Sequence, residues 1–240
     1  MYSLVVMLSD FSDKLHIFIS LIVACFLSTA MFYLVTAPGH NLLKAYIAYR
    51  EGDEKVKVRG HLRFRIKKSF NWVGVVSSLF LFMPIVHPVY YKNSNFYERN
   101  KGTVKIALSG VLCYFLFAIT LTCIYQGLRA AGIYDITTAT KANFSPDLEK
   151  IIYHCIFSTV YFWSRLCYFA TFINFLPIIP LDFGEILALV LRVNWIDFLK
   201  NNEVLVSFIV SFISLFTVAR PSGLYSQWTT DIVNLIGMAF

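Results

Sequence analysis

The amino-acid sequence predicts an all-α polytopic membrane protein, on the grounds of its composition and its long uncharged runs. Of its 240 residues, 58% are hydrophobic and only 15% are charged, with a mean hydropathy of +0.64. Soluble domains carry about 25% charged residues, so this chain is too apolar for that class. We expect one membrane-embedded domain over residues 1–240, a bundle of about four to six transmembrane or re-entrant helices.

The first expected span is Leu15–Ala37, which contains no Asp, Glu, Lys or Arg. Pro38 and Gly39 interrupt the run, because proline removes a helical hydrogen bond and disfavours helical geometry in the residue before it. One interpretation is a kink, with the helix resuming to about Tyr49. The other is a helix end, followed by a second helix that starts at Pro38.

Basic residues dominate the segment after this helix, residues 50–68. Its hydrophobic residues alternate from Val56 to Ile66, which predicts a small basic strand-like hairpin. The hairpin would lie on anionic lipid headgroups, or its charge reflects the usual Lys and Arg excess of short cytoplasmic loops, which we favour. Either way, residues 50–105 are expected to be cytoplasmic and the N-terminus external, in a bacterial plasma membrane. Nucleic-acid binding explains the net charge of +7 poorly, because the cations flank membrane spans.

The rest of the chain alternates between apolar segments and polar loops. Acidic residues dilute the basic ones in residues 126–150, so we expect this loop to be external. Arg165 falls inside an apolar span, where a cation is costly unless it faces protein or water. It either lines a polar groove or pairs with a neighbouring carbonyl or acid, and we favour the pair. The expected segments are a re-entrant stretch at 70–89, spans at 106–125, 151–179 and 204–219, a short helix at 183–193 and a further helix at 224–240.

Several short motifs follow one another along the chain. The sequence His40-Asn41-Leu42-Leu43-Lys44 lies near the end of the first helix, and Gly52-Asp53 begins eight residues after Lys44. Further motifs are Gly60–Phe64, Asn71–Gly74, Ala107–Val111 and the segment Asn-Phe-Leu-Pro-Ile-Ile-Pro-Leu-Asp-Phe-Gly at 174–184. Their order and spacing resemble the site-2 protease family of intramembrane zinc metalloproteases over residues 20–190.

The resemblance implies a site-2-protease-like helical bundle, with a zinc centre built on a His-Glu-x-x-His helix and a distant Asp. His40 matches the first zinc-binding His and Asp182 the third ligand, whereas Asn41 replaces the catalytic Glu and Lys44 replaces the second His. An amide accepts no proton near neutral pH, and an ammonium group has no lone pair for a metal. We therefore expect a remnant of a zinc site, with no catalytic residue, no bound metal and no cofactor.

Three functions are compatible with these features. The favoured one is a catalytically inactive scaffold, regulator or subunit that lies in the bilayer and binds another membrane protein. The second is an intramembrane metalloprotease with a rearranged zinc site that combines His40, His61 or His87 with Asp182. The third is a transporter subunit whose intramembrane polar groups are His40, Lys44, Arg165, Asp182 and Glu185.

The family fold also implies what fills the altered site. Asp182 would lie beside the His40–Lys44 face without the metal that compensates its charge, and a lone buried carboxylate is strongly disfavoured. We therefore predict that Lys44 pairs with Asp182, with His40 or Asn41 hydrogen-bonded alongside. The competing arrangement has Glu185 capturing Lys44 while Asp182 caps its own helix.

Overall fold

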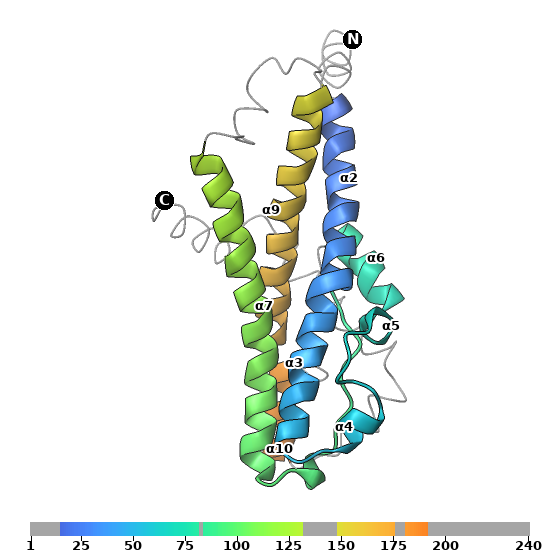
Figure 1. Cartoon of the computed structure of the whole chain (residues 1–240), viewed down its shortest axis with the longest axis vertical. Helices are drawn as coiled ribbons and strands as arrows, with labels where there is room; N and C mark the ends of the chain where they lie inside the picture. Colours follow the sequence, from blue (N-terminus) through green and yellow to red (C-terminus); the bar gives the residue numbers. More distant parts are fainter. Residues whose placement is uncertain (1–14, 82–83, 132–147, 176–180, 192–240) are drawn as a thin grey trace.

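The computed structural model describes residues 15–81, 84–131, 148–175 and 181–191. Within these ranges the regular secondary structure is helical, and no residue is in a strand. Long helices lie side by side along the longest axis of the molecule, with short helices against one flank (Figure 1). The expected segments at 204–219 and 224–240, and residues 132–147 of the expected loop at 126–150, fall outside the described residues.

The first long helix runs through Pro38 without stopping. It consists of α2 (Leu15–Met31), the π-helical turn η1 (Phe32–Thr36) and α3 (Ala37–Arg50). The wider turn lies directly before the proline, and the Ala37 N–H donates to the Phe32 carbonyl across it. Such π-turns absorb a local break in the hydrogen-bond ladder. Of the two interpretations, the uninterrupted chain of helical residues excludes a helix end at Pro38.

Among the described residues, two helices are long and apolar enough to cross a membrane. They are Ile19–Arg50 and α7 (Arg99–Ala130), each of 32 residues. The expected span at 106–125 lies at the centre of a longer helix that could cross a membrane. Both helices expose large hydrophobic side chains to their surroundings, as suits contact with lipid tails; these include Ile19, Phe26, Leu34, Leu108, Leu112 and Leu116.

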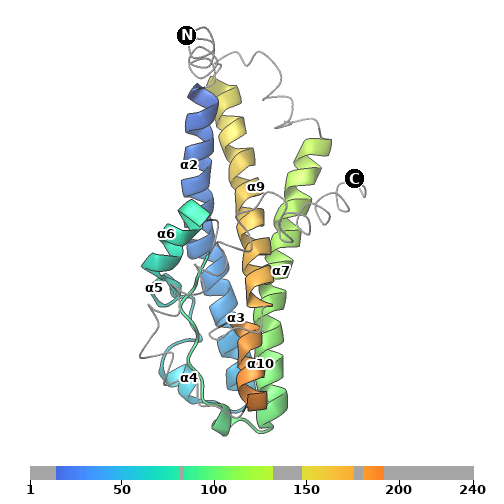
Figure 2. The same cartoon turned by 180° about the vertical axis from the view of Figure 1, so that it is seen from behind.

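The third long helix, α9 (Leu148–Asn174), packs against both α2 and α7. Figure 2 shows α9 beside α2 at one end and beside α7 further along, with α10 (Asp182–Leu191) near α3 and α7. The buried contacts between the long helices combine aromatic with aliphatic side chains, and one cluster contains Phe32, Tyr114, Leu166 and Tyr168. This packing fixes the relative position of α3, α7 and α10, from which the site described below is built.

The expected strand-like hairpin at 56–66 is wrong. Residues 55–58 form the helical turn α4 (Lys55–Val58), and Ile66–Ser69 forms the turn α5, with bends between them. The backbone N–H groups are used locally, because His61 donates to the Val56 carbonyl and Gly60 to the Lys57 carbonyl. Gly60 adopts a φ of 70°, which reverses the chain and which L side chains rarely adopt. The alternating pattern has no common buried face, because Val56 is buried whereas Val58, Phe64 and Ile66 are exposed beside the cations.

Asp53 fastens this basic segment to the loop that precedes α7. Its side chain is fully buried and accepts hydrogen bonds from the Lys55 and Lys92 backbone N–H groups and from the Asn95 amide, at 3.3, 2.8 and 2.7 Å. Three donors satisfy a buried carboxylate that would otherwise be costly. The Gly52-Asp53 motif therefore has a structural role that needs no metal.

The expected re-entrant stretch at 70–89 contains a short helix followed by extended chain. Helix α6 (Trp72–Leu81) packs against α2, and at ~1.5 Å per residue it reaches only about half-way across a bilayer. The returning chain passes very close to Gly74, where a Cβ would collide with the Ile85 carbonyl. The Tyr33 hydroxyl, which donates to the same carbonyl at 3.0 Å, holds the returning chain against the first helix.

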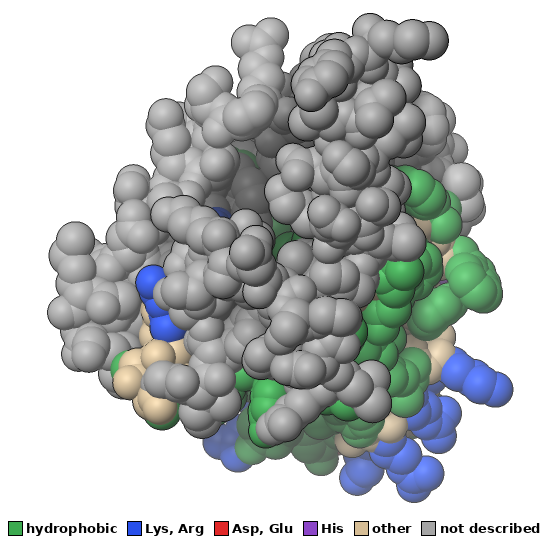
Figure 3. Space-filling view, turned by 90° about the horizontal axis from the view of Figure 1, so that it is seen from above, with side chains coloured by type: hydrophobic (Ala, Val, Ile, Leu, Met, Phe, Trp, Pro, Cys, Tyr) green, Lys and Arg blue, Asp and Glu red, His purple; other side chains and the backbone are tan. Residues whose placement is uncertain are grey.

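One flank of the bundle combines exposed hydrophobic side chains with Lys and Arg side chains. Seen along the long axis (Figure 3), hydrophobic side chains cover part of one flank, and Lys and Arg side chains lie at its edge. The exposed hydrophobic residues of the short helices and their connections include Val58, Phe64, Trp72 and Phe80. A basic rim beside an apolar flank is typical of the boundary between lipid tails and headgroups.

Candidate functional site

The polar centre of the molecule lies where α3, α7 and α10 meet. His40 and Lys44 are one turn apart on α3, so their side chains project from the same face. Asp182 begins α10 and lies between them: its Oδ2 is 2.9 Å from His40 Nε2, and its Oδ1 is 2.5 Å from Lys44 Nζ. All three side chains are buried: His40 is 5% exposed, Lys44 2% and Asp182 3%. The structure thus brings together residues that are 138 or more positions apart in the chain.

Lys44 also contacts the next acid along α10. Its Nζ donates to Glu185 Oε1 at 3.2 Å, and the Tyr91 hydroxyl donates to the other carboxylate oxygen of Glu185. The predicted Lys44–Asp182 pair therefore coexists with the Lys44–Glu185 contact of the competing arrangement, because one ammonium group bridges both acids. With three N–H donors, an ammonium can serve two carboxylates at once. The bridge joins the first long helix to the start of α10.

Asn41 contacts the ring nitrogen of His40 that does not face Asp182. Its amide nitrogen donates to Ser69 Oγ and to the His87 carbonyl, both at 2.9 Å. A carbonyl can only accept, so these bonds fix the orientation of the amide and turn its oxygen toward His40 Nδ1, 3.2 Å away. Both ring nitrogens of His40 thus face oxygen acceptors. A metal ligand must present a free nitrogen lone pair, and both ring nitrogens are already engaged by these side-chain contacts.

Two residues of α7 complete the enclosure. The Tyr114 ring stacks on the His40 ring, with centroids 4.2 Å apart and planes 15° apart. Gly110 lies against the ion pair itself, because a Cβ at this position would be 2.8 Å from His40 Nε2 and would overlap the Asp182 carboxylate. The absence of a side chain at Gly110 is what lets α7 approach this closely.

The zinc centre that the resemblance implies does not fit these residues. A catalytic zinc site needs about three protein ligands and an open position for water. Here the Lys44 ammonium, at the position that the resemblance assigns to the second His, lies against Asp182 Oδ1, and a cation there repels a metal ion. Within the described ranges, no three His, Cys, Asp or Glu side chains are grouped so that they could hold a metal ion.

The remaining candidate residues lie outside this cluster. His61 makes no hydrogen bond to His40 or Asp182 in the part of the chain that the structure describes, and burial, with Lys68 and Arg59 nearby, lowers its pKa. His87 reaches the site through its backbone carbonyl. Arg165 donates hydrogen bonds from Nε and an Nη to the Tyr161 hydroxyl one turn earlier, at 3.1 and 2.8 Å, and its guanidinium lies over the same ring. The pair with a carbonyl or acid that we favoured for Arg165 stays a prediction.

Comparisons with known proteins add no identification, since no family model, curated protein or solved structure matches the chain.

Proposed function

We propose that this chain is a non-catalytic integral membrane protein with a site-2-protease-like architecture, which acts as a scaffold, regulator or subunit for another membrane protein. The observation that carries the proposal is the Lys44 ammonium, 2.5 Å from Asp182 and buried where a metalloprotease needs a metal ligand. The Asn41 amide, which is held by Ser69 and the His87 carbonyl, cannot act as the base that activates water. On this proposal the polar centre holds α3 and α10 together, and the function of the protein is to bind another membrane protein.

The proposal predicts that changing two side chains is enough to create zinc binding at this site. The double change Asn41→Glu with Lys44→His should give a protein that retains zinc, because the new imidazole joins His40 and Asp182 in a three-ligand set. Asn41→Glu alone should retain none, since Lys44 still pairs with Asp182. Elemental analysis of purified, dialysed protein measures the zinc-to-chain ratio.

A matched control separates the site from a general effect of added histidine. Lys105→His changes another paired lysine, whose Nζ lies 2.7 Å from Glu51 on the surface, and should leave zinc content unchanged. Metal-dependent cleavage of a membrane substrate by the unmodified protein would refute the non-catalytic function. Failure of the folded double variant to take up zinc would refute the proposed arrangement of the site.

We also infer a topology in which the N-terminus is external, residues 50–105 are cytoplasmic and residues 126–150 are external, in a bacterial plasma membrane. The excess of Lys and Arg in residues 50–105 supports it. A cysteine introduced at Lys57 should be labelled by a membrane-impermeant maleimide only from the cytoplasmic side, and one at Asp135 only from outside. Labelling of both from the same side would contradict this orientation.

A further inference from the structure

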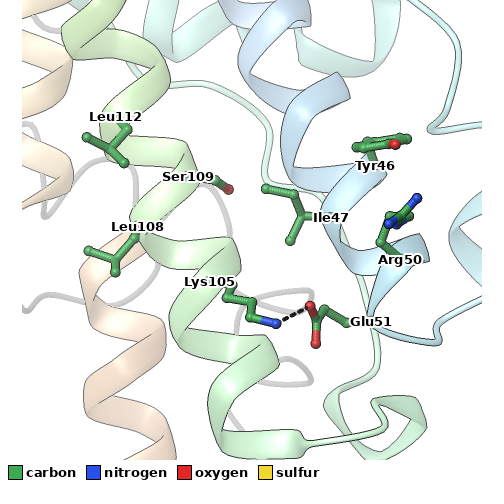
Figure 4. Close-up of a pocket in the computed structure, with 8 residues that line it drawn as sticks. All are labelled: Tyr46, Ile47, Arg50, Glu51, Lys105, Leu108, Ser109 and Leu112. Carbon is green, nitrogen blue, oxygen red and sulfur yellow. Dashed lines mark hydrogen bonds and ion pairs between the residues drawn. The ribbon is translucent and has the colours of Figure 1, made fainter.

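A groove between α3 and α7 lies apart from the polar centre and has no assigned role. It encloses about 480 Å³, within the ~300–1,000 Å³ usual for small-molecule sites. Figure 4 shows Ile47 and Ser109 between the two helices, with Tyr46 and Arg50 on one side and Leu108 and Leu112 on the other. Lys105 reaches across to Glu51 and closes one end of the groove.

The two ends of the groove differ in polarity. At the closed end, Lys105 gives one bond to Glu51 and keeps two N–H donors, and its side chain is 58% exposed. The exposed Arg50 guanidinium makes no hydrogen bond or ion pair with any residue within the described ranges. Along the helix axis away from these cations, Leu108, Leu112 and Leu116 expose 42%, 54% and 62% of their surface.

We propose that this groove binds one anionic phospholipid, with its phosphate against Arg50 and Lys105 and an acyl chain along Leu108, Leu112 and Leu116. The cations meet the apolar stripe where charged headgroups meet tails, and basic pockets between membrane helices bind such headgroups. Arg50 presents the fork of donors that suits a phosphate. A neutral apolar partner would leave this guanidinium without a counter-charge.

The lipid site depends on α3 and α7 crossing the membrane and is independent of the altered zinc centre. Loss of the lipid site would therefore leave the non-catalytic assignment unchanged, and zinc binding by the unmodified protein would leave the lipid site unchanged. No residue is shared, because the polar centre uses His40, Lys44 and Asp182 while the groove uses the outer faces of the same helices.

Native mass spectrometry of the full chain in detergent micelles tests the proposal. The probes are phosphatidylglycerol and phosphatidylcholine with identical acyl chains, added at matched concentrations. We expect one phosphatidylglycerol to be retained in preference to phosphatidylcholine. Arg50→Glu should weaken phosphatidylglycerol retention about thirtyfold, because reversing one charge at the membrane surface changes binding by about twice the effect of a single cation.

Arg99→Glu is the matched control, since Arg99 is also an exposed arginine and begins α7, the helix that carries Lys105, but lies outside the groove. It should leave retention unchanged. Arg50→Gln, which removes the charge without reversing it, should give an intermediate loss. Equal retention of the two lipids, or equal losses for Arg50→Glu and Arg99→Glu, would overturn the proposal. Displacement of the lipid by glycerol 3-phosphate at equal concentration would instead assign the groove to a soluble phosphate.

Discussion

Replacing Lys44 with methionine is expected to lower the free energy of unfolding by ~3–5 kcal/mol, because it leaves buried carboxylates without their cation. Among the described residues, the Asp182 carboxylate would keep His40 as its partner and the Glu185 carboxylate would keep Tyr91. The loss should be measured by equilibrium unfolding in mixed detergent micelles. Methionine keeps the length and apolar contacts of the lysine stem, so the change reports mainly on the charge.

The double change Lys44→Met with Asp182→Leu should recover much of this loss, since it removes the buried carboxylate together with its cation. Recovery should be incomplete because Glu185 remains, although its side chain is 22% exposed and retains the Tyr91 hydroxyl. Lys101→Met is the control: it breaks an exposed pair of similar length, 2.7 Å to Glu98, and should cost at most ~1 kcal/mol. A double variant that is less stable than Lys44→Met would contradict the pairing.

Gly110→Ala is expected to destabilise the protein by about 1–3 kcal/mol despite the better helix propensity of alanine. The added Cβ would overlap the Asp182 carboxylate and press on His40, so α7 must move away or the ion pair must open. Thermal unfolding of the purified protein measures the change. Combining Gly110→Ala with Lys44→Met should give less than the sum of the two losses, because both act on one network.

Gly127→Ala on the same helix supplies the control. A Cβ at Gly127 meets no atom within 4 Å. The substitution should therefore stabilise α7 by roughly 0.5–1 kcal/mol, because alanine has less conformational freedom than glycine in the unfolded chain. Opposite signs at the two glycines would show that the space beside Asp182 is responsible. Similar effects at both positions would contradict the close approach of α7 to the ion pair.

Much of the polar centre could be predicted from the sequence because motif order carries long-range information. The spacing of His40 and Lys44 places them on one helical face, and the resemblance placed the distant Asp182 beside them. Local pattern alone could not have joined residues so far apart. Gly110 lies inside one of the motifs that carry the resemblance. The same resemblance could therefore have indicated that another helix lies close to α7 at this glycine.

Other residues of the polar centre could not be predicted from the sequence. Tyr91, which donates to Glu185, lies in a loop whose path depends on the Asp53 anchor and on the packing of α6. Tyr114 is one of many aromatic residues in apolar helices, so nothing in the sequence marks it as the ring that stacks on His40. The basic segment misled the prediction because alternation over Val56–Ile66 resembles a strand, whereas Gly60 and local hydrogen bonds produce turns.

The most direct test of the account is an experimental structure of the unmodified protein prepared with excess zinc, with diffraction data collected at the zinc absorption edge. We predict no anomalous peak between His40 and Asp182, and a Lys44 nitrogen within hydrogen-bonding distance of Asp182. A zinc peak at that position, or a Lys44 nitrogen farther than about 4 Å from both Asp182 and Glu185, would contradict the claim that a lysine has replaced the metal.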